Sequence, residues 1–421
     1  MKKHTLLSEQ SITNRKLLDD RVKEALVLLP SGEGKAILNF WGSPGEGRTT
    51  LLEHLRELLS INGITVIVGM WDADKKSVDE LIVDIKAWLE IHTQEIIKVI
   101  LIDNVRALLA DGSDNPHFVQ FEHNLVAEIV NRNDVLMIIA SQHEIRQWHE
   151  LLIRMRQASY LIPPLTREEF DENARVRGMQ PEAAFELSLG HPALLNWIYE
   201  KPGIDVEKID IQAVKYFLRE LDDNVREEAR ALSLLLQFDE VIMEKVLKAA
   251  GLGQEKTYFD LLDSIRQMGF TGLLIHESRI GVYRFTDPSI RRLLARGVMN
   301  NNPNKFHDIH KLISDYYCNA AHRASILQYN LCSAIYHLAW NTKLNGKNSY
   351  DHCVGWVNEM LPMWKDADWD QVWHAWLHGQ GEPVIILELQ NLLSEDGYNK
   401  LSHMLKAEWR KSHEKANNKS G

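Results

Sequence analysis

The segment Ala36–Leu52, AILNFWGSPGEGRTTLL, decides the fold of this chain. Its first part, Ile37–Trp41, is apolar and predicts a β-strand, and a helical pattern begins near Arg48. Between them, Gly42–Thr49 has the G-x-x-x-x-G-[K]-[ST] spacing of a phosphate-binding loop, with arginine where lysine is usual. The strand–loop–helix order predicts a nucleotide site here, and an ordinary glycine-rich turn is the alternative.

The predicted site depends on the backbone of the loop. Its three glycines allow successive N–H groups to point inward, and the positive end of the next helix faces the β-phosphate. Arg48 keeps the charge of the usual lysine, but its planar guanidinium is bulkier, so we expect binding to tolerate it better than fast turnover. The predicted nucleotide-binding residues of the loop are Gly42, Ser43, Pro44, Gly45, Glu46, Gly47, Arg48, Thr49 and Thr50.

The composition is that of a folded protein with several domains. The chain has 421 residues, of which 45% are hydrophobic and 25% charged, and this length predicts two to four domains. A net charge of −11 does not favour nucleic acid as a partner, although a local basic face would be compatible with it. The sequence has only three cysteines, which suits a reducing compartment, and it shows no apolar leader, so we expect a cytoplasmic protein. It also shows no long apolar run, so we expect no membrane segment.

Alternating strand and helix patterns predict an α/β domain over residues 36–163, with a parallel sheet covered on both faces. Besides Ile37–Trp41, the predicted strands are Ile64–Met70, expected to be buried, Ile96–Ile102, Val135–Ala140 and Tyr160–Ile162. The predicted helices are Leu51–Leu59, Ser77–Ile91 and Phe121–Asn131.

An aspartate ends one of these strands and completes the predicted site. Asp103 follows Ile96–Ile102, and we expect it to hold Mg²⁺ together with the Thr49 hydroxyl, across adjacent strand ends. The next residue, Asn104, occupies the position where an acidic side chain would polarise the attacking water. An amide cannot act as a base, so we expect weak ATP hydrolysis or none. The polar segment Ser141–His143 either senses a γ-phosphate or caps a helix from Glu144 onward.

The rest of the chain is mostly helical. We predict an N-terminal segment over 1–35 with a helix at Arg15–Leu29, a helical lid over 164–217, a winged-helix domain over 218–298 and an α-helical domain over 304–421. The winged helix follows from three helices and a hairpin, and its third helix carries balanced charges that favour packing over DNA reading. Asn300–Asn304 is predicted to be a linker.

Tryptophans are concentrated near the C-terminus. Trp369, Trp373 and Trp376 have helical spacing, and Trp356, Trp364 and Trp409 lie nearby. Aromatic core filling is one interpretation, and a recognition surface is the other.

The order of these motifs resembles the STAND class of P-loop NTPases over residues 12–298. Ile12–Arg15 resembles the h-x-G-R signature whose backbone lies against adenine, and Gly190–Pro192 resembles the lid G-x-P, whose proline packs on the base. Phe285–Asp287 resembles the M-H-D triplet, with Thr286 in place of the histidine that reaches the β-phosphate of ADP. The resemblance thus implies that Arg15, Pro192 and Thr286 also contact the nucleotide.

This resemblance implies a switch that binds ADP or ATP with Mg²⁺ in signalling, defence or regulation. ADP would hold a closed monomer, and ATP would favour an open, oligomerising form that acts on a partner protein through the C-terminal helices. Arg48, Asn104 and Thr286 depart from the family pattern in ways that weaken turnover or the closed state. Two alternatives are a DNA-binding ATPase of the AAA+ type that uses its winged helix and a scaffold with a decayed site.

Overall fold

The computed structural model describes two compact units. The first takes in Met1–Glu220 and Arg266–Leu273, and the second Leu221–Ile265 and Leu274–Gly421, so the chain passes between the units three times. The residues that the structure describes are 16–43, 45, 47–61, 66–93, 97–105, 115–142, 144–145, 148–162, 165, 167–201, 203–252, 256–277, 281–378 and 384–419.

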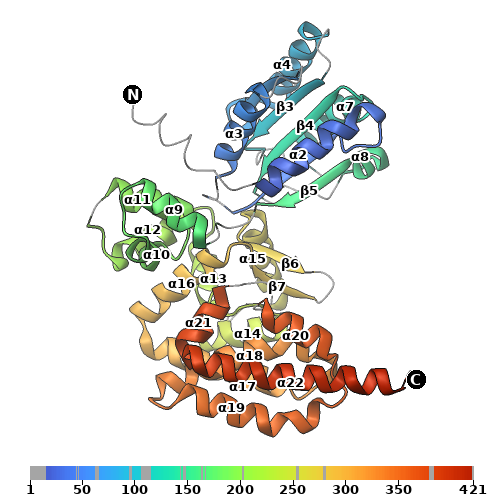
Figure 1. The fold of residues 1–421 in the computed structure, drawn as a ribbon. Coiled ribbons are helices and arrows are strands. Elements are labelled where there is room, and N and C mark those ends of the chain that lie inside the picture. The colour runs from blue at the N-terminus through green and yellow to red at the C-terminus, as the bar shows by residue number, and fades with distance from the viewer. Residues whose placement is uncertain are drawn as a thin grey trace. The chain divides into compact units, whose positions relative to one another are not determined.

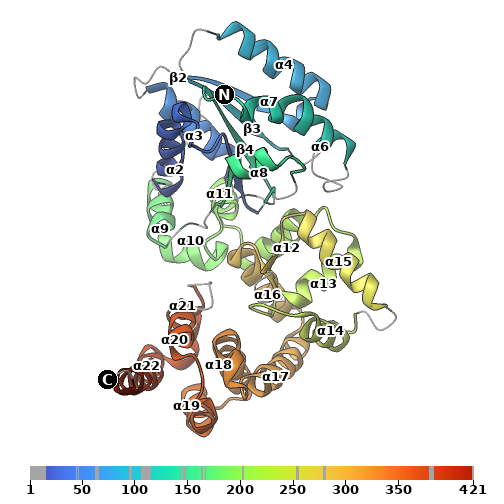
Figure 2. The same cartoon turned by 90° about the vertical axis from the view of Figure 1, so that its right-hand side faces the viewer.

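A five-stranded parallel sheet in the order β2-β3-β4-β1-β5 forms the centre of the first unit. The inner strands β3, β4 and β1 are buried at every residue, because helices cover both faces of the sheet (Figures 1 and 2). The strands are β1 (Ile37–Trp41), β2 (Val66–Asp72), β3 (Ile97–Asp103), β4 (Val135–Ser141) and β5 (Gln157–Leu161). The predicted parallel α/β sheet is therefore confirmed.

Two predictions about the sheet are wrong. The strand expected to be buried at Ile64–Met70 is β2, which lies at an edge of the sheet and buries only Gly69. The ends of β1 and β3 are not adjacent, because β4 lies between these two strands. Strand order depends on contacts between distant segments, and the local patterns along the chain do not specify it.

The helices around the sheet match most of the predicted ones. Ser77 caps α4 through a capping box with Glu80. The helix expected from Glu144 is wrong, since α8 begins at Leu151, and the helix expected at Phe121–Asn131 begins earlier and contains a π-helical turn, Glu122–Val126. The helices are α2 (Lys16–Leu28), α3 (Arg48–Ile61), α4 (Val78–Ile91), α6 (Pro116–Phe121), α7 (Ala127–Val130) and α8 (Leu151–Arg156).

The predicted lid region is a group of four helices that belongs to the first unit. A small core of Phe170, Ala174, Ala184 and Leu195 holds it together. Its helices are α9 (Arg167–Val176), α10 (Pro181–Ser188), α11 (Pro192–Glu200) and α12 (Val206–Phe217). Thr166, the residue before the first of them, lies outside the described residues.

The elements predicted at 218–298 lie mostly in the second unit, but the third of their helices continues from Arg266 into the first unit. Three helices precede an antiparallel hairpin, and Phe238 forms an additional bridge to Tyr283 of the hairpin. These elements are α13 (Asp223–Leu232), α14 (Glu240–Ala249), α15 (Tyr258–Phe270), β6 (Leu274–Glu277) and β7 (Val282–Phe285). Their order is the predicted one, and the assignment as a winged-helix domain stays a prediction.

The expected linker at Asn300–Asn304 is wrong. α16 continues to Asn301 and α17 begins at Pro303, so only Asn302 separates the two helices. The Asn302 side chain accepts a hydrogen bond from the backbone N–H of Lys305 and caps α17. An asparagine-rich stretch can therefore be a helix junction, because asparagine is favoured at caps as well as in linkers.

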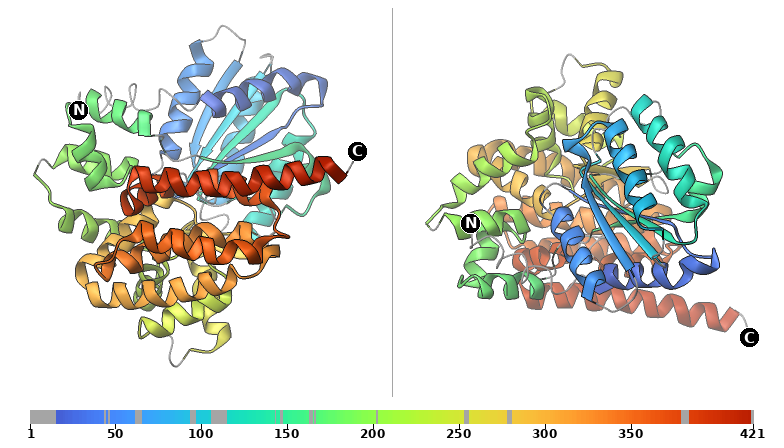
Figure 3. Two further views of the ribbon diagram at one scale, coloured as in Figure 1. Left: turned by 60° about the horizontal axis from the view of Figure 1, so that its bottom comes forward. Right: turned by 90° about the horizontal axis from the view of Figure 1, so that it is seen from above.

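The C-terminal region is helical, and Figure 3 shows the long helix α22 in this region. Trp364, Trp369 and Trp376 are buried, which supports core filling over a recognition surface for these three side chains. In the described part of the chain, none of the helices combines the length and the apolar character of a membrane span. The helices are α16 (Pro288–Asn301), α17 (Pro303–Ala320), α18 (Leu327–Leu344), α19 (Ser349–Met360), α20 (Trp369–Leu377), α21 (Val384–Leu393) and α22 (Glu395–Lys419).

Candidate functional site

The predicted phosphate loop connects β1 directly to α3. Gly42 donates its backbone N–H to the Ser141 carbonyl at 3.2 Å, which holds the start of the loop against the end of β4. Gly45 and Gly47 have φ angles of +86° and +82°, a conformation that strongly favours glycine. Arg48 is the first residue of α3, so the helix begins where the motif predicts and directs its N-terminal N–H groups to the loop.

Thr49 and Asp103 lie together. The Thr49 hydroxyl donates to Asp103 Oδ2 at 2.6 Å, and the carboxylate is almost fully buried at the end of β3. The two residues meet although β4 separates β1 from β3, because α3 packs against β2, β3 and β4 and carries Thr49 to β3. The structure thus brings together the two residues that the sequence assigned to Mg²⁺.

The chemistry of this pair fits Mg²⁺. Hydroxyl and carboxylate oxygens are hard ligands, and Mg²⁺ in nucleotide sites commonly takes one or two protein oxygens, with phosphate and water completing its shell. Across the described ranges, no group of three or more His, Cys, Asp or Glu side chains is arranged to hold a metal by itself. Thr49 and Asp103 would hold the ion, which would neutralise phosphate charge.

A second carboxylate, Asp72, lies beside this pair and was not identified from the sequence. Asp72 ends β2 in register with Asp103 on β3, and Asn104 Nδ2 donates to Asp72 Oδ1 at 3.1 Å. Lys75 forms an ion pair with Asp72 at 2.6 Å. Burial disfavours the charged carboxylate, but the hydrogen bonds from Lys75 and Asn104 outweigh this effect and lower the pKa of Asp72.

The lid contacts the loop at Gly45. A Cβ atom placed on Gly45 would lie 2.8 Å from Ala193 Cβ and 2.9 Å from His191 Cε1. His191 is fully buried, caps α11 by accepting the Ala193 N–H, and packs edge-on against Phe217 at 4.6 Å between ring centroids. The lid motif therefore touches the loop through His191 and Ala193, which flank the predicted residue Pro192.

Buried polar side chains extend the site along the ends of β1 and β4. Asn39, inside β1, donates to the Ser141 hydroxyl at 2.6 Å and accepts the Ile145 N–H at 3.0 Å. The Ser43 hydroxyl donates to the Gly272 carbonyl at 3.2 Å. Gln142 is buried, and among the described residues its Oε1 has no hydrogen-bond partner. An asparagine in an otherwise apolar strand was the available sequence signal for this network.

The remaining predicted nucleotide-binding residues lie on different elements of the two units. Thr50 lies in the first turn of α3 and Pro192 is the first residue of α11. Thr286 is in the second unit, where it is buried just before Asp287, the residue that caps α16. Arg15, Pro44, Glu46 and His143 lie outside the described residues.

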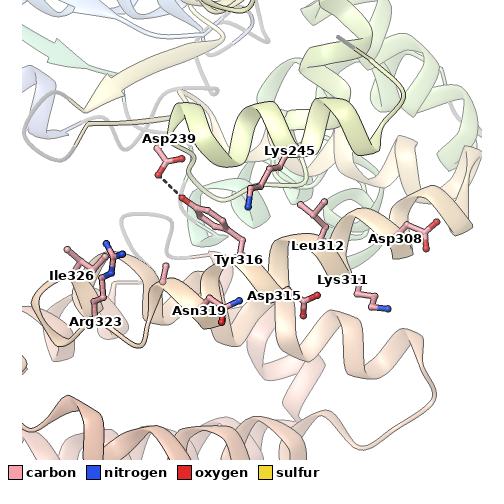
Figure 4. Close-up of a pocket in the computed structure, with 11 residues that line it drawn as sticks. Asp239, Lys245, Asp308, Lys311, Leu312, Asp315, Tyr316, Asn319, Arg323 and Ile326 are labelled. Carbon is pink, nitrogen blue, oxygen red and sulfur yellow. Dashed lines mark hydrogen bonds between the residues drawn. The ribbon is translucent and has the colours of Figure 1, made fainter. Parts of the chain in front are cut away.

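The second unit has a pocket of about 680 Å³ beside α14 and α17 (Figure 4). The Tyr316 hydroxyl, which lines the pocket, donates to Asp239 at 2.9 Å, and this carboxylate also caps α14. The charged side chains in the lining include both signs. They are Asp239, Lys245, Asp308, Lys311, Asp315 and Arg323.

Two histidines are buried together in the second unit. The Nδ1 atoms of His310 and His337 are 3.0 Å apart. Burial, followed by the charges of Arg291 and His307, lowers the pKa of His310 to about 3. Burial, followed by His310 and Arg291, lowers the pKa of His337 well below its usual value. Both imidazoles are therefore neutral in the folded chain at ordinary pH.

Comparisons with known proteins identify no family for this chain. No protein-family model matches the sequence, and no curated protein matches it. Solved structures give distant similarities. The ADP form of the Aeropyrum pernix ORC2 protein is 11% identical with a TM-score of 0.41, and the match covers 68% of this chain and 93% of that one.

Two further structures are similar at the same low level. AMPPCP-bound DnaA from Aquifex aeolicus is 15% identical with a TM-score of 0.35, and the match covers 61% of this chain and 93% of that one. The Thermotoga maritima RuvB Holliday junction branch migration motor is 12% identical with a TM-score of 0.33, and the match covers 68% of this chain and 98% of that one.

Proposed function

We propose that this chain binds ADP or ATP with Mg²⁺ on the loop Gly42–Thr49 and acts as a nucleotide-dependent switch. The observation that carries the proposal is the contact between the Thr49 hydroxyl and Asp103 at 2.6 Å, at the first turn of the helix that follows the loop. A glycine-rich turn with only a connecting role would not require a buried carboxylate at this hydroxyl. The pair supplies the oxygen ligands that Mg²⁺ prefers.

The switch part of the proposal is supported by the contact of the lid with Gly45. His191 and Ala193 lie so close to this residue that a change in the loop on binding phosphate would alter the packing of α11. A ligand with unequal affinity for two lid positions would shift the balance between them. The change in lid position would in turn favour association with a partner protein or with other copies of this chain, in signalling, defence or regulation.

Nucleotide affinity of matched variants tests the site. We expect Arg48→Ala to lose binding of a fluorescent ADP or ATP analogue, by roughly tenfold or more, because a charge-assisted contact to phosphate is worth about 1.5–3 kcal/mol. Arg56→Ala is the control, since it removes the same charge from an exposed position on the same helix. Equal affinity of the wild type and Arg48→Ala would contradict the proposed site.

The magnesium ligands are tested separately. We expect Asp103→Asn to bind nucleotide in the presence of EDTA as the wild type does, but to lose the gain in affinity that Mg²⁺ gives the wild type. Titration calorimetry with and without Mg²⁺ measures this difference. An unchanged response to Mg²⁺ would remove Asp103 from the metal site.

A further inference from the structure

Asn104 has an unusual backbone that places its amide against Asp72. It follows Asp103 with a φ of +56°, a left-handed conformation that asparagine tolerates better than most residues. Its own N–H donates to Asp103 Oδ1 at 2.9 Å, while its side chain donates to Asp72 Oδ1 at 3.1 Å. Asn104 thus links the carboxylates at the ends of two neighbouring strands.

Asp72 is close enough to the predicted site to act in it. Asp72 and Asp103 are paired in register on β2 and β3, and neighbouring strands lie about 4.8 Å apart. Paired residues of parallel strands project to the same face of the sheet, and on that face Asp103 meets Thr49. The Asp72 side chain is 26% exposed, so water reaches it.

We propose that Asp72 orients the water that attacks the γ-phosphate of bound ATP, and that Asn104 holds Asp72 in position for this role. The inference rests on the proposed function. The amide of Asn104, directly after β3, cannot polarise water as a carboxylate would, but here the carboxylate comes from the end of the neighbouring strand β2. The usual motif places the water-polarising carboxylate directly after the aspartate that ends β3. In this chain that position holds the amide of Asn104, and the carboxylate is Asp72 at the end of β2.

The reaction balances with ATP and water alone. The water oxygen forms a bond to the γ-phosphorus, and the bond from that phosphorus to the β,γ-bridging oxygen breaks, so that ADP leaves with the electron pair. The Asp72 carboxylate accepts a hydrogen bond from the water, one water proton is released to solvent, and the other remains on the phosphate. Because phosphoryl transfer depends mostly on positioning and charge, a carboxylate that accepts a hydrogen bond from the water is sufficient.

A local structural role accounts for only part of this arrangement. Asp72 accepts the Asp74 N–H at 3.2 Å and pairs with Lys75, as a residue that caps a short turn would. These contacts do not require Asn104 to adopt a left-handed backbone. The cap of the short turn at Asp72 therefore does not explain the hydrogen bond from Asn104 to Asp72, whereas the positioning of a water does.

Single-turnover hydrolysis by the full chain, with excess protein over radiolabelled ATP and Mg²⁺, tests the inference. We expect Asp72→Asn to hydrolyse roughly 10²-fold more slowly, the lower end of the usual contribution of such a group, while its nucleotide affinity stays within about twofold of the wild type. We expect the double variant Asp72→Asn/Asn104→Asp to recover much of the rate, because it restores one carboxylate and one amide. Asp74→Asn is the control, because it removes an exposed carboxylate from the same turn.

The outcomes separate this inference from the proposed function. Absence of nucleotide binding in the wild type overturns both. With binding intact, the inference alone is overturned if the wild type hydrolyses no ATP, if Asp72→Asn is as fast as the wild type, or if the double variant is as slow as Asp72→Asn. A loss of affinity in Asp72→Asn that matches its loss of rate also overturns it, since that result indicates a structural role.

Discussion

Gly45 is subject to two separate constraints. Its left-handed backbone excludes most side chains, and the lid residues His191 and Ala193 leave no room for a Cβ atom. The first constraint belongs to the loop, and the second exists only because α11 packs onto it. The loop geometry of the motif requires a glycine at this position, and the contact with the lid requires one as well.

Alanine substitutions distinguish these two constraints. Gly203 has the same φ of +86°, but a Cβ atom placed there would meet nothing within 4 Å. We expect Gly203→Ala to lose about 1–2 kcal/mol from backbone strain alone. We expect Gly45→Ala to lose about 1–3 kcal/mol more from overpacking. Urea denaturation of both variants measures the difference, and equal losses would mean that the lid does not crowd the loop.

The buried histidines His310 and His337 predict a dependence of stability on pH. Their pKa values are lowered in the folded chain, so the unfolded chain takes up more protons below about pH 6.5. The stabilisation from the neutral imidazoles is complete above that pH and is lost at lower pH, for His310 as the pH falls toward about 3.

Each buried histidine adds up to about 1.4 kcal/mol per pH unit to the slope of unfolding free energy against pH. Urea denaturation of the wild type and His310→Gln between pH 7 and pH 4 measures this slope. We expect a shallower slope in the variant, whatever its stability at pH 7. Parallel curves would show that His310 takes up no extra proton on unfolding.

At the scale of elements, local patterns predicted most helices and strands. The apolar run at β3 and the helical pattern at α4 depend on neighbouring residues, and the strand and helix predicted from them are confirmed. Lys98 within β3 does not interrupt the strand, because its ammonium reaches Asp134 at 2.9 Å. The hydrogen bonds from Arg132 and Lys98 also lower the pKa of Asp134 despite the effect of burial.

The parts that the sequence did not predict depend on contacts between distant residues. The position of β4 between β3 and β1 makes β2 an edge strand and leaves Asp72 beside Asp103. No motif on β2 marks this aspartate, since its role depends on the register of two strands. Thr49 and Asp103 were predictable as a pair because both belong to motifs with known spacing.

The helix junction at Asn302 gives a prediction about one cap. Asn302 is exposed and its side chain accepts the Lys305 N–H, so Asn302→Ala should destabilise the chain by about 0.5–2 kcal/mol. Asn301→Ala, at the end of α16, is the control and should have a smaller effect. Urea denaturation measures both, and equal effects would contradict a cap at Asn302.

At the scale of the whole molecule, a switch requires the second unit to respond to a ligand bound by the first. Hydrogen exchange in the presence of Mg·ADP or Mg·ATP tests this requirement. We expect slower exchange at the loop and α11 with either nucleotide, because bound ligand stabilises the structure it contacts. We also expect the second unit to exchange at different rates with ADP and with ATP. Identical rates there would contradict the switch but leave nucleotide binding intact.

The division of the chain into interleaved units affects how it folds during synthesis. The last segment of the first unit, Arg266–Leu273, comes after Leu221–Ile265 of the second unit along the chain. The first unit therefore stays incomplete until residue 273 has emerged from the ribosome. Gly272, which accepts the hydrogen bond from Ser43 in the predicted phosphate loop, lies within that late segment. Domains usually fold as they emerge, N-terminal first. In this chain, the nascent loop therefore emerges well before one of its hydrogen-bond partners, and the proposed nucleotide site would be unfinished during that interval.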